Sequence, residues 1–248
     1  SSNKSGRTYA GWCWDAGSST VSNTDGTGAT SVQVRANQTA GFSIITFTSP
    51  STTTASYSVG HGLNAAPEFW MWKSRGNTGS WQVYFTALGS SSNRLNLNST
   101  GAVSSSYPGS ATSSVINLSD GPTAAFPGTN IIYAWTPVAG YSAFGKTVGN
   151  NSTDGSFVYT GFRPRFIIWR PTADGHSWLL IDTARDTYNI ADATLRAQNN
   201  SIESHFDWGD VLSNGFKIRN TDTNPSGVDI AWAAWAENPF QANGGLAR

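Results

Sequence analysis

Apolar residues along this chain come in short runs and seldom recur at the three- and four-residue spacing of an amphipathic helix. The runs are rich in Ile, Val, Phe, Tyr and Trp, and they end at Gly, Asn, Ser or Pro, which is the pattern of β-strands separated by turns. The pattern predicts an all-β fold in which only two stretches, 189–198 and 209–212, could form short helices. The predicted strands are Phe42–Thr48, Tyr57–Val59, Glu68–Lys73, Trp81–Thr86, Arg94–Asn98, Ser114–Asn117, Asn130–Trp135, Ser142–Thr147, Phe157–Thr160, Arg165–Arg170, Ser177–Asp182, Phe216–Asn220 and Ile230–Trp235.

The second half of the chain repeats the first. Residues 67–87 align without a gap on residues 164–184, and 7 of these 21 pairs are identical, among them a proline, a phenylalanine and two tryptophans. The expected closing strands also correspond, since 133–135 (Tyr-Ala-Trp) resembles 233–235 (Ala-Ala-Trp), and the segment 9–12 (Tyr-Ala-Gly-Trp) has the same ending. Internal repetition of this kind marks duplicated structural units.

The repeat predicts two tandem, internally duplicated antiparallel β-sandwich units with a jelly-roll-like arrangement. The first unit would cover residues 37–138, and the second, with a C-terminal tail, residues 139–248. Residues 1–36 would then hold the closing strand of a preceding unit and a linker. Because tryptophans recur at matched positions in both units, we expect them in the core, where each buried indole removes on the order of 200 Å² from water.

Charge in this sequence is scarce and balanced. Only 12% of the residues are charged, and 15 Lys and Arg offset 15 Asp and Glu. Such a chain lacks the basic face that nucleic-acid binding requires and the polybasic segment that anionic membranes attract. We therefore expect no nucleic-acid partner and no membrane insertion. The single cysteine, Cys13, cannot form an intrachain disulfide, and we expect a buried, unreactive thiol between Trp12 and Trp14.

The sequence offers little catalytic chemistry. Its three histidines lie in separate segments, and the common nucleophile, zinc-protease, Walker and dinucleotide motifs do not occur. Loops rich in Asn and Asp lack the alternating acidic spacing of a calcium-binding loop. We therefore predict no catalytic residue, no cofactor and no metal, and we interpret His61, which lies between two glycines, as a turn residue bonded to the backbone.

One charged segment near the C-terminus is a candidate ligand site. If this segment is extended, Glu203, His205 and Asp207 share one face, with Trp208 and Asp210 beside them. Such a group could hold a cation or, with the indole as a stacking plane, a sugar. The corresponding part of the first unit carries no charge, so the fold does not need these residues. The alternative is a solvated loop in which Asp207 or Asp210 caps a short helix.

Trp70 and Tyr107 are two further candidates for ligand binding. Neither has an aromatic counterpart in the second unit, so the shared fold does not require them. We expect both to be exposed contact residues.

Several segments together carry a resemblance to a known family. They are Tyr9–Gly17, Val21–Gly26, Gly41–Thr46, Val59–Pro67, Asn151–Pro164, Asp182–Asn189, Leu212–Arg219 and Ala236–Phe240. In these segments the chain resembles virion proteins of marine tailed phages, especially cyanophages, over nearly its whole length.

The resemblance implies a tail-fibre or other virion appendage protein, made in the host cytoplasm and assembled into the particle. It supplies no known catalytic residues. We therefore expect a non-enzymatic module for structure and for adhesion to a host-surface glycan. Its partners would be further copies of itself, in a homo-oligomer such as a trimer, and other virion proteins.

Three alternative functions stay open at this point. The chain could be a carbohydrate-binding module or a free lectin, which would use the same aromatic residues. It could be a hydrolytic tailspike with Glu203, Asp207 and Asp210 as acids, provided that two carboxylates lie about 5–9.5 Å apart. It could also be a capsid decoration protein or another structural virion protein without a receptor.

Overall fold

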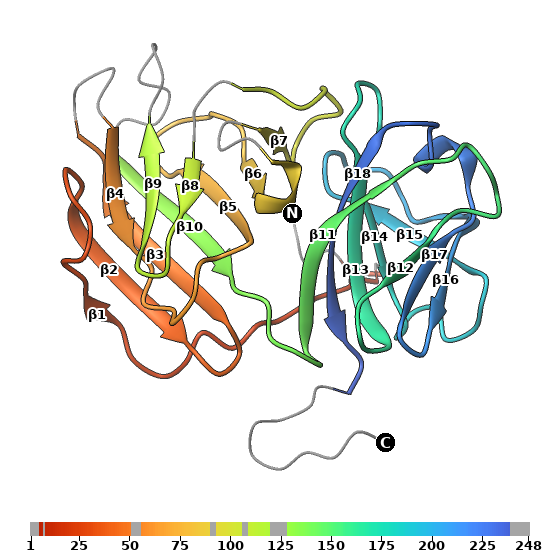
Figure 1. Cartoon of the computed structure of the whole chain (residues 1–248), viewed down its shortest axis with the longest axis horizontal. Helices are drawn as coiled ribbons and strands as arrows, with labels where there is room; N and C mark the ends of the chain where they lie inside the picture. The colour runs from red at the N-terminus through yellow and green to blue at the C-terminus, as the bar shows by residue number, and fades with distance from the viewer. Residues whose placement is uncertain are drawn as a thin grey trace.

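The protein is an all-β molecule built from two units that lie side by side (Figure 1). The structure, a computed structural model, describes residues 5–6, 8–50, 56–89, 93–105, 109–119 and 128–238. The strands pair in antiparallel ladders, which confirms the predicted fold class.

The first unit is a sandwich of two antiparallel sheets. In spatial order, the seven-stranded sheet consists of β1 (Val21–Ser22), β2 (Thr30–Asn37), β3 (Phe42–Thr48), β10 (Thr129–Trp135), β5 (Phe69–Ser74), β6 (Gln82–Phe85) and β7 (Arg94–Asn96). The facing sheet consists of β4 (Ser56–Gly60), β9 (Val115–Ser119) and β8 (Gly109–Ala111). A short 3₁₀ turn, η1 (Thr86–Leu88), follows β6.

The second unit is one eight-stranded sheet that curls into a nearly closed barrel (Figure 1). In spatial order, its strands are β11 (Ser142–Val148), β18 (Asp229–Ala236), β13 (Pro164–Pro171), β14 (Leu179–Asp182), β15 (Ala191–Arg196), β16 (Ser204–Leu212), β17 (Gly215–Ile218) and β12 (Phe157–Tyr159). A second 3₁₀ turn, η3 (Thr221–Thr223), precedes β18.

The expected start of the first unit at residue 37 is wrong. Strand β2 pairs with β3 along most of its length, and β1 pairs with β2, so residues 21–37 complete the seven-stranded sheet. The segment 9–12, expected as the last strand of a preceding unit, forms no strand.

The two expected helices are also wrong. The stretch 189–198 contains β15, and 209–212 belongs to β16. A side chain explains why the first stretch is extended. The Asn189 amide donates to the Val211 carbonyl at 3.0 Å and accepts from the Val211 N–H at 2.8 Å, which ties the chain before β15 to β16.

The central strands of both units are covered on both faces, and repeat-equivalent residues occupy equivalent faces in the two units. On β5, Trp70 and Trp72 point into the sandwich core, while Phe69 points to the other face of the sheet. On β13, Trp169 points into the barrel, while Phe166 points outward. Each repeat therefore contributes one face to its own core and the opposite face to a contact between the units.

Repeat-equivalent aromatic residues meet in this contact. Phe69 and Trp135 are opposite one another on β5 and β10, and Phe166 and Trp235 have the same relation on β13 and β18. The ring centroid of Trp235 lies 5.8 Å from that of Trp135 and 6.1 Å from that of Phe69. Because equivalent residues face each other, the contact resembles the self-complementary interface of a twofold dimer.

The segment before the first strand packs on this aromatic cluster. The Trp14 ring lies 5.1 Å from Trp235, and the Trp12 ring lies 4.9 Å from Phe166. Since both indoles turn toward the cluster, Cys13 between them faces away and is exposed. The expectation of a buried thiol is therefore wrong.

A buried arginine joins the second unit to a loop of the first. Arg170 is fully buried, and its guanidinium donates to the carbonyls of Ser99 (3.1 Å) and Gly101. It also lies 5.7 Å from the centroid of the Trp178 ring, whose N–H donates to the Asn96 carbonyl at 2.8 Å. Burial lowers the pKa of Arg170 to about 10, so the side chain is charged at neutral pH.

Candidate functional site

The charged segment predicted as a ligand site is extended, as expected, but its acids do not gather into one cluster. Glu203 pairs with Arg185, and Asp192 accepts from His205 at 2.8 Å. The hydrogen bond to Asp192 is the largest cause of a raised pKa at His205. His205 Nε2 also lies 3.6 Å from a Glu203 oxygen. The two predicted residues that the fold does bring together, Glu203 and His205, thus form part of a surface ion-pair network.

Asp210 belongs to a different network. Its carboxylate pairs with Arg219 at 2.7 Å, and Arg219 also pairs with Asp154 at 2.7 Å. The Lys217 ammonium, 2.6 Å from Asp154, is the main cause of the lowered pKa of that carboxyl. Asp207 is exposed and takes part in none of the ion pairs in the described part of the chain.

Trp208 is not the exposed stacking plane that we expected. It is only 4% exposed, and its ring packs in the barrel core with an edge-on contact to Phe206 at 5.7 Å. The pairing of β16 with β15 shifts register beside this residue, which breaks the simple alternation of faces that the prediction assumed.

Trp70 is also buried, at 3% exposure, so the expectation of an exposed contact residue is wrong. Its ring lies inside the first unit, where it borders a pocket. Tyr107, the other aromatic candidate, lies outside the described residues.

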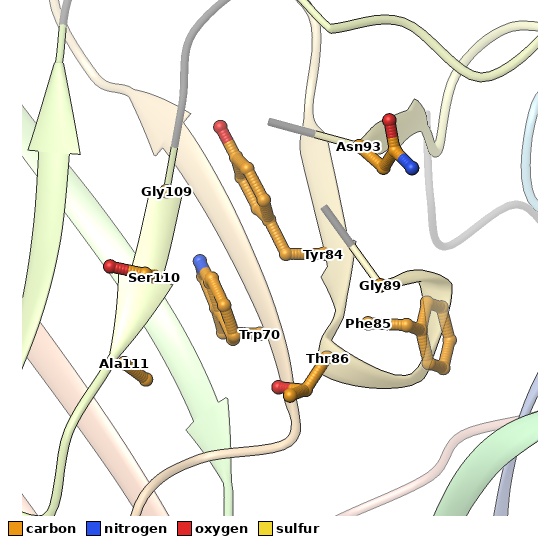
Figure 2. Close-up of a pocket in the computed structure, with 9 residues that line it drawn as sticks. All are labelled: Trp70, Tyr84, Phe85, Thr86, Gly89, Asn93, Gly109, Ser110 and Ala111. Atoms are coloured by element: carbon orange, nitrogen blue, oxygen red, sulfur yellow. The ribbon is translucent and has the colours of Figure 1, made fainter. Parts of the chain in front are cut away.

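The pocket at Trp70 has a volume of about 180 Å³ and lies between β5, β6 and β8 (Figure 2). Trp70 and Tyr84 are directly opposite one another on β5 and β6, and their rings stack at 5.0 Å with planes 7° apart. Gly109 and Ser110 of β8 line the pocket beside them. A side chain at Gly109 would crowd this ring pair, because a Cβ there would lie 3.0 Å from the Tyr84 ring and the ring would have to shift.

The indole N–H of Trp70 has no acceptor within the described residues. Its nitrogen is fully enclosed, and Figure 2 shows the nitrogen end of the ring turned toward Gly109 and Ser110. Leaving an enclosed donor unsatisfied costs about 1–3 kcal/mol. Five other enclosed indoles also have no acceptor within the described residues, those of Trp135, Trp169, Trp208, Trp232 and Trp235. Trp70 differs from them in bordering a small uncharged pocket, where an outside acceptor would satisfy its donor after a small shift of β8.

The remaining polar groups of the pocket are uncharged at neutral pH. Thr86 contributes a hydroxyl, Tyr84 contributes a phenol, and Asn93 contributes an amide that donates to the Leu88 carbonyl at 3.0 Å. The Ser110 hydroxyl points away from Trp70 and accepts from the Asn117 amide at 3.3 Å (Figure 2). The nine lining residues include no Asp, Glu, Lys, Arg or His. A pair of aromatic rings with hydroxyl and amide groups suits a neutral ligand that carries hydroxyls.

Sequence reasoning found Trp70 but missed the rest of the pocket. The missed signal was a second unmatched aromatic residue. Trp70 and Tyr84 align with Ile167 and Ile181 of the second unit. Both aromatic rings of the stacked pair therefore occur only in the first unit. A search for unmatched aromatics in adjacent predicted strands would have paired them.

His61 is a structural residue, as we interpreted it. The Leu63 N–H donates to Nδ1 at 3.1 Å, so the proton is on Nε2, which donates to the Thr112 carbonyl at 3.1 Å. The ring is buried, and burial lowers its pKa, so the side chain is neutral at pH 7. His61 therefore fastens β4 to the turn between β8 and β9.

The described residues contain no group of three or more His, Cys, Asp or Glu side chains that could hold a metal ion. No helix in the same part of the chain is long or apolar enough to cross a bilayer.

A family model described as "Domain of unknown function (DUF7483)" matches residues 1–239. The chain therefore belongs to this family. The comparisons found no significant match among curated proteins and none among solved structures.

Proposed function

We propose that this member of the DUF7483 family is a non-enzymatic module of a phage virion appendage that attaches the particle to a host-surface glycan. The observation that carries the proposal is the enclosed, unsatisfied N–H of Trp70 in an uncharged pocket beside a stacked aromatic pair. The resemblance to marine phage virion proteins supports the virion context.

The size of the pocket favours one sugar residue. Its volume of about 180 Å³ is smaller than the roughly 300–1,000 Å³ of pockets for drug-sized ligands. A sugar hydroxyl would accept from Trp70 Nε1 after a small shift of β8 that uncovers this enclosed nitrogen. The ligand would therefore be a neutral residue at the end of a glycan or at a branch.

One small pocket gives weak binding, and multiple copies would compensate. Linked sites raise the overall avidity by about 10²–10⁴ without any new contact. The proposal therefore includes a homo-oligomer in the particle. A carbohydrate-binding module or free lectin would use the same pocket outside a virion.

Two matched variants test the proposal. Trp70→Phe keeps the aromatic ring but removes the unsatisfied donor, so we expect affinity for the best-binding neutral methyl hexoside to fall about 3- to 10-fold. Its stability should fall by less than that of Trp72→Phe, because both substitutions remove the same buried volume but this one breaks no protein hydrogen bond. Affinities would be measured by NMR titration and stability by urea unfolding.

Trp72→Phe is the control on the same strand. Trp72 Nε1 donates to Asn130 Oδ1 at 3.0 Å, and the ring does not line the pocket. This variant should lose about 1–3 kcal/mol of stability, because a buried acceptor loses its donor, while sugar affinity stays at the wild-type value. Equal affinity of Trp70→Phe and wild type for every neutral hexoside would contradict the proposed site.

A further inference from the structure

The second unit has a pocket of its own, with a different chemistry. It has a volume of about 320 Å³ and lies between the loop that precedes β14, strands β15 and β16, and η3. Its polar lining includes His176, Ser177, Arg196 and Asp222, and the buried indole of Trp208 also borders it.

Two donors at this pocket have no acceptor within the described residues. The Nε of Arg196 and the Nε1 of Trp208 are both enclosed without a hydrogen-bond partner. Trp208 is 4% exposed as a whole, so its N–H cannot turn to solvent without moving the core.

The charge of Arg196 is also unmatched. Arg163, Arg165, Arg185 and Arg219 each lie within 4 Å of a carboxylate, but Arg196 forms none of the ion pairs in the described part of the chain. A half-buried guanidinium without a counter-charge is costly, because it has lost part of its hydration. Asp222 lines the same pocket but forms no ion pair with Arg196, so no carboxylate of the described residues neutralises this guanidinium directly.

We propose that this pocket binds a sugar residue that carries a carboxylate, such as a uronic acid. The guanidinium of Arg196 presents the fork of donors that matches a carboxylate, and the Trp208 ring forms part of the pocket wall. The exposed Asp222 at the same pocket accepts from sugar hydroxyls and disfavours ligands with several negative charges. One carboxylate among hydroxyls fits this combination.

This inference rests on the proposed function and gives it a substrate class. With a neutral pocket in the first unit and a carboxylate-binding pocket in the second, one chain would bind both neutral and acidic sugar residues. The glycan would then be an acidic heteropolysaccharide rather than a neutral polymer.

Isothermal titration calorimetry with methyl galacturonide, its methyl ester and methyl galactoside tests the inference. We expect the wild type to bind the galacturonide, and the uncharged ester to bind on the order of 10- to 100-fold more weakly, because a charge-assisted hydrogen bond is lost. Raising the salt concentration should weaken galacturonide binding and leave binding of the neutral galactoside unchanged.

Arg196→Gln should reduce galacturonide affinity by a similar factor. Arg75→Gln, which removes the same charge from an exposed position in the first unit, should not. The comparison of the acid with its ester uses only wild-type protein, so it decides the question even if Arg196→Gln fails to fold.

The failures of the two proposals are distinguishable. If the galacturonide and its ester bind equally, or if Arg196→Gln binds the acid as the wild type does, the carboxylate site is refuted. The proposed neutral sugar site is then tested by the affinity of Trp70→Phe alone. If Trp70→Phe removes galacturonide binding and Arg196→Gln does not, the acid binds in the first unit and this inference is wrong.

Discussion

Replacing Trp235 with alanine is expected to lower the free energy of unfolding by about 3–5 kcal/mol. The indole is 5% exposed and lies at the centre of the contact between the units. Its ring centroid is within about 6 Å of the rings of several aromatic neighbours, which are Trp14, Phe69, Trp135, Phe144 and Phe166. Since these neighbours belong to both units, a cavity here cannot be closed by one unit alone.

Equilibrium urea unfolding followed by far-UV circular dichroism measures this effect. The wild type should unfold in one transition because the two units share a core, and Trp235→Ala should shift the midpoint to lower urea. Tyr188→Ala is the control: Tyr188 is 83% exposed, so its removal should change stability by less than about 0.5 kcal/mol. An unchanged midpoint for Trp235→Ala would mean that the units do not depend on this contact.

Replacing Arg170 with alanine is expected to cost about 2–4 kcal/mol. The substitution removes the donors from the carbonyls of Ser99 and Gly101 inside the contact, and such charge-assisted bonds are worth about 1.5–3 kcal/mol each. Part of that loss is offset, because the guanidinium no longer has to be buried. The lowered pKa of Arg170 reports this cost of burial.

The repeat provides a matched control for Arg170. Its counterpart Lys73 also donates to backbone carbonyls, those of Ser74 and Asn77, both at 2.9 Å. These carbonyls belong to its own hairpin, and Lys73 is only half-buried. Lys73→Ala should therefore cost less than about 1 kcal/mol in the same urea experiment. Equal losses for the two variants would show that Arg170 does not join the units.

The strands were accessible from the sequence because they depend on local patterns, whereas the contact between the units was not predicted. The continuous apolar run 166–169 is typical of a strand covered on both faces, but only the structure shows that Phe69 and Phe166 lie on the faces that meet. The domain boundary was wrong because β2 has no counterpart in the alignment that defined the repeat. Only its ladder with β3 shows that it belongs to the first unit.

The candidate sites were harder to predict because they depend on partners distant in sequence. Asp210 and Asp154 meet through Arg219, and no spacing rule connects them. Trp70 has no aromatic counterpart in the second unit, which suggested a role outside the shared fold. The sequence comparison could not show that β8 covers the ring.

We propose that the protein binds a glycan without reacting with it. The direct measurement is to incubate the protein with purified surface polysaccharide from the host, and to follow both binding by calorimetry and the release of reducing ends. We predict saturable binding, reduced by Trp70→Phe, with no increase in reducing ends over the polysaccharide alone. No binding, or a steady rise in reducing ends with added protein, would refute this proposal.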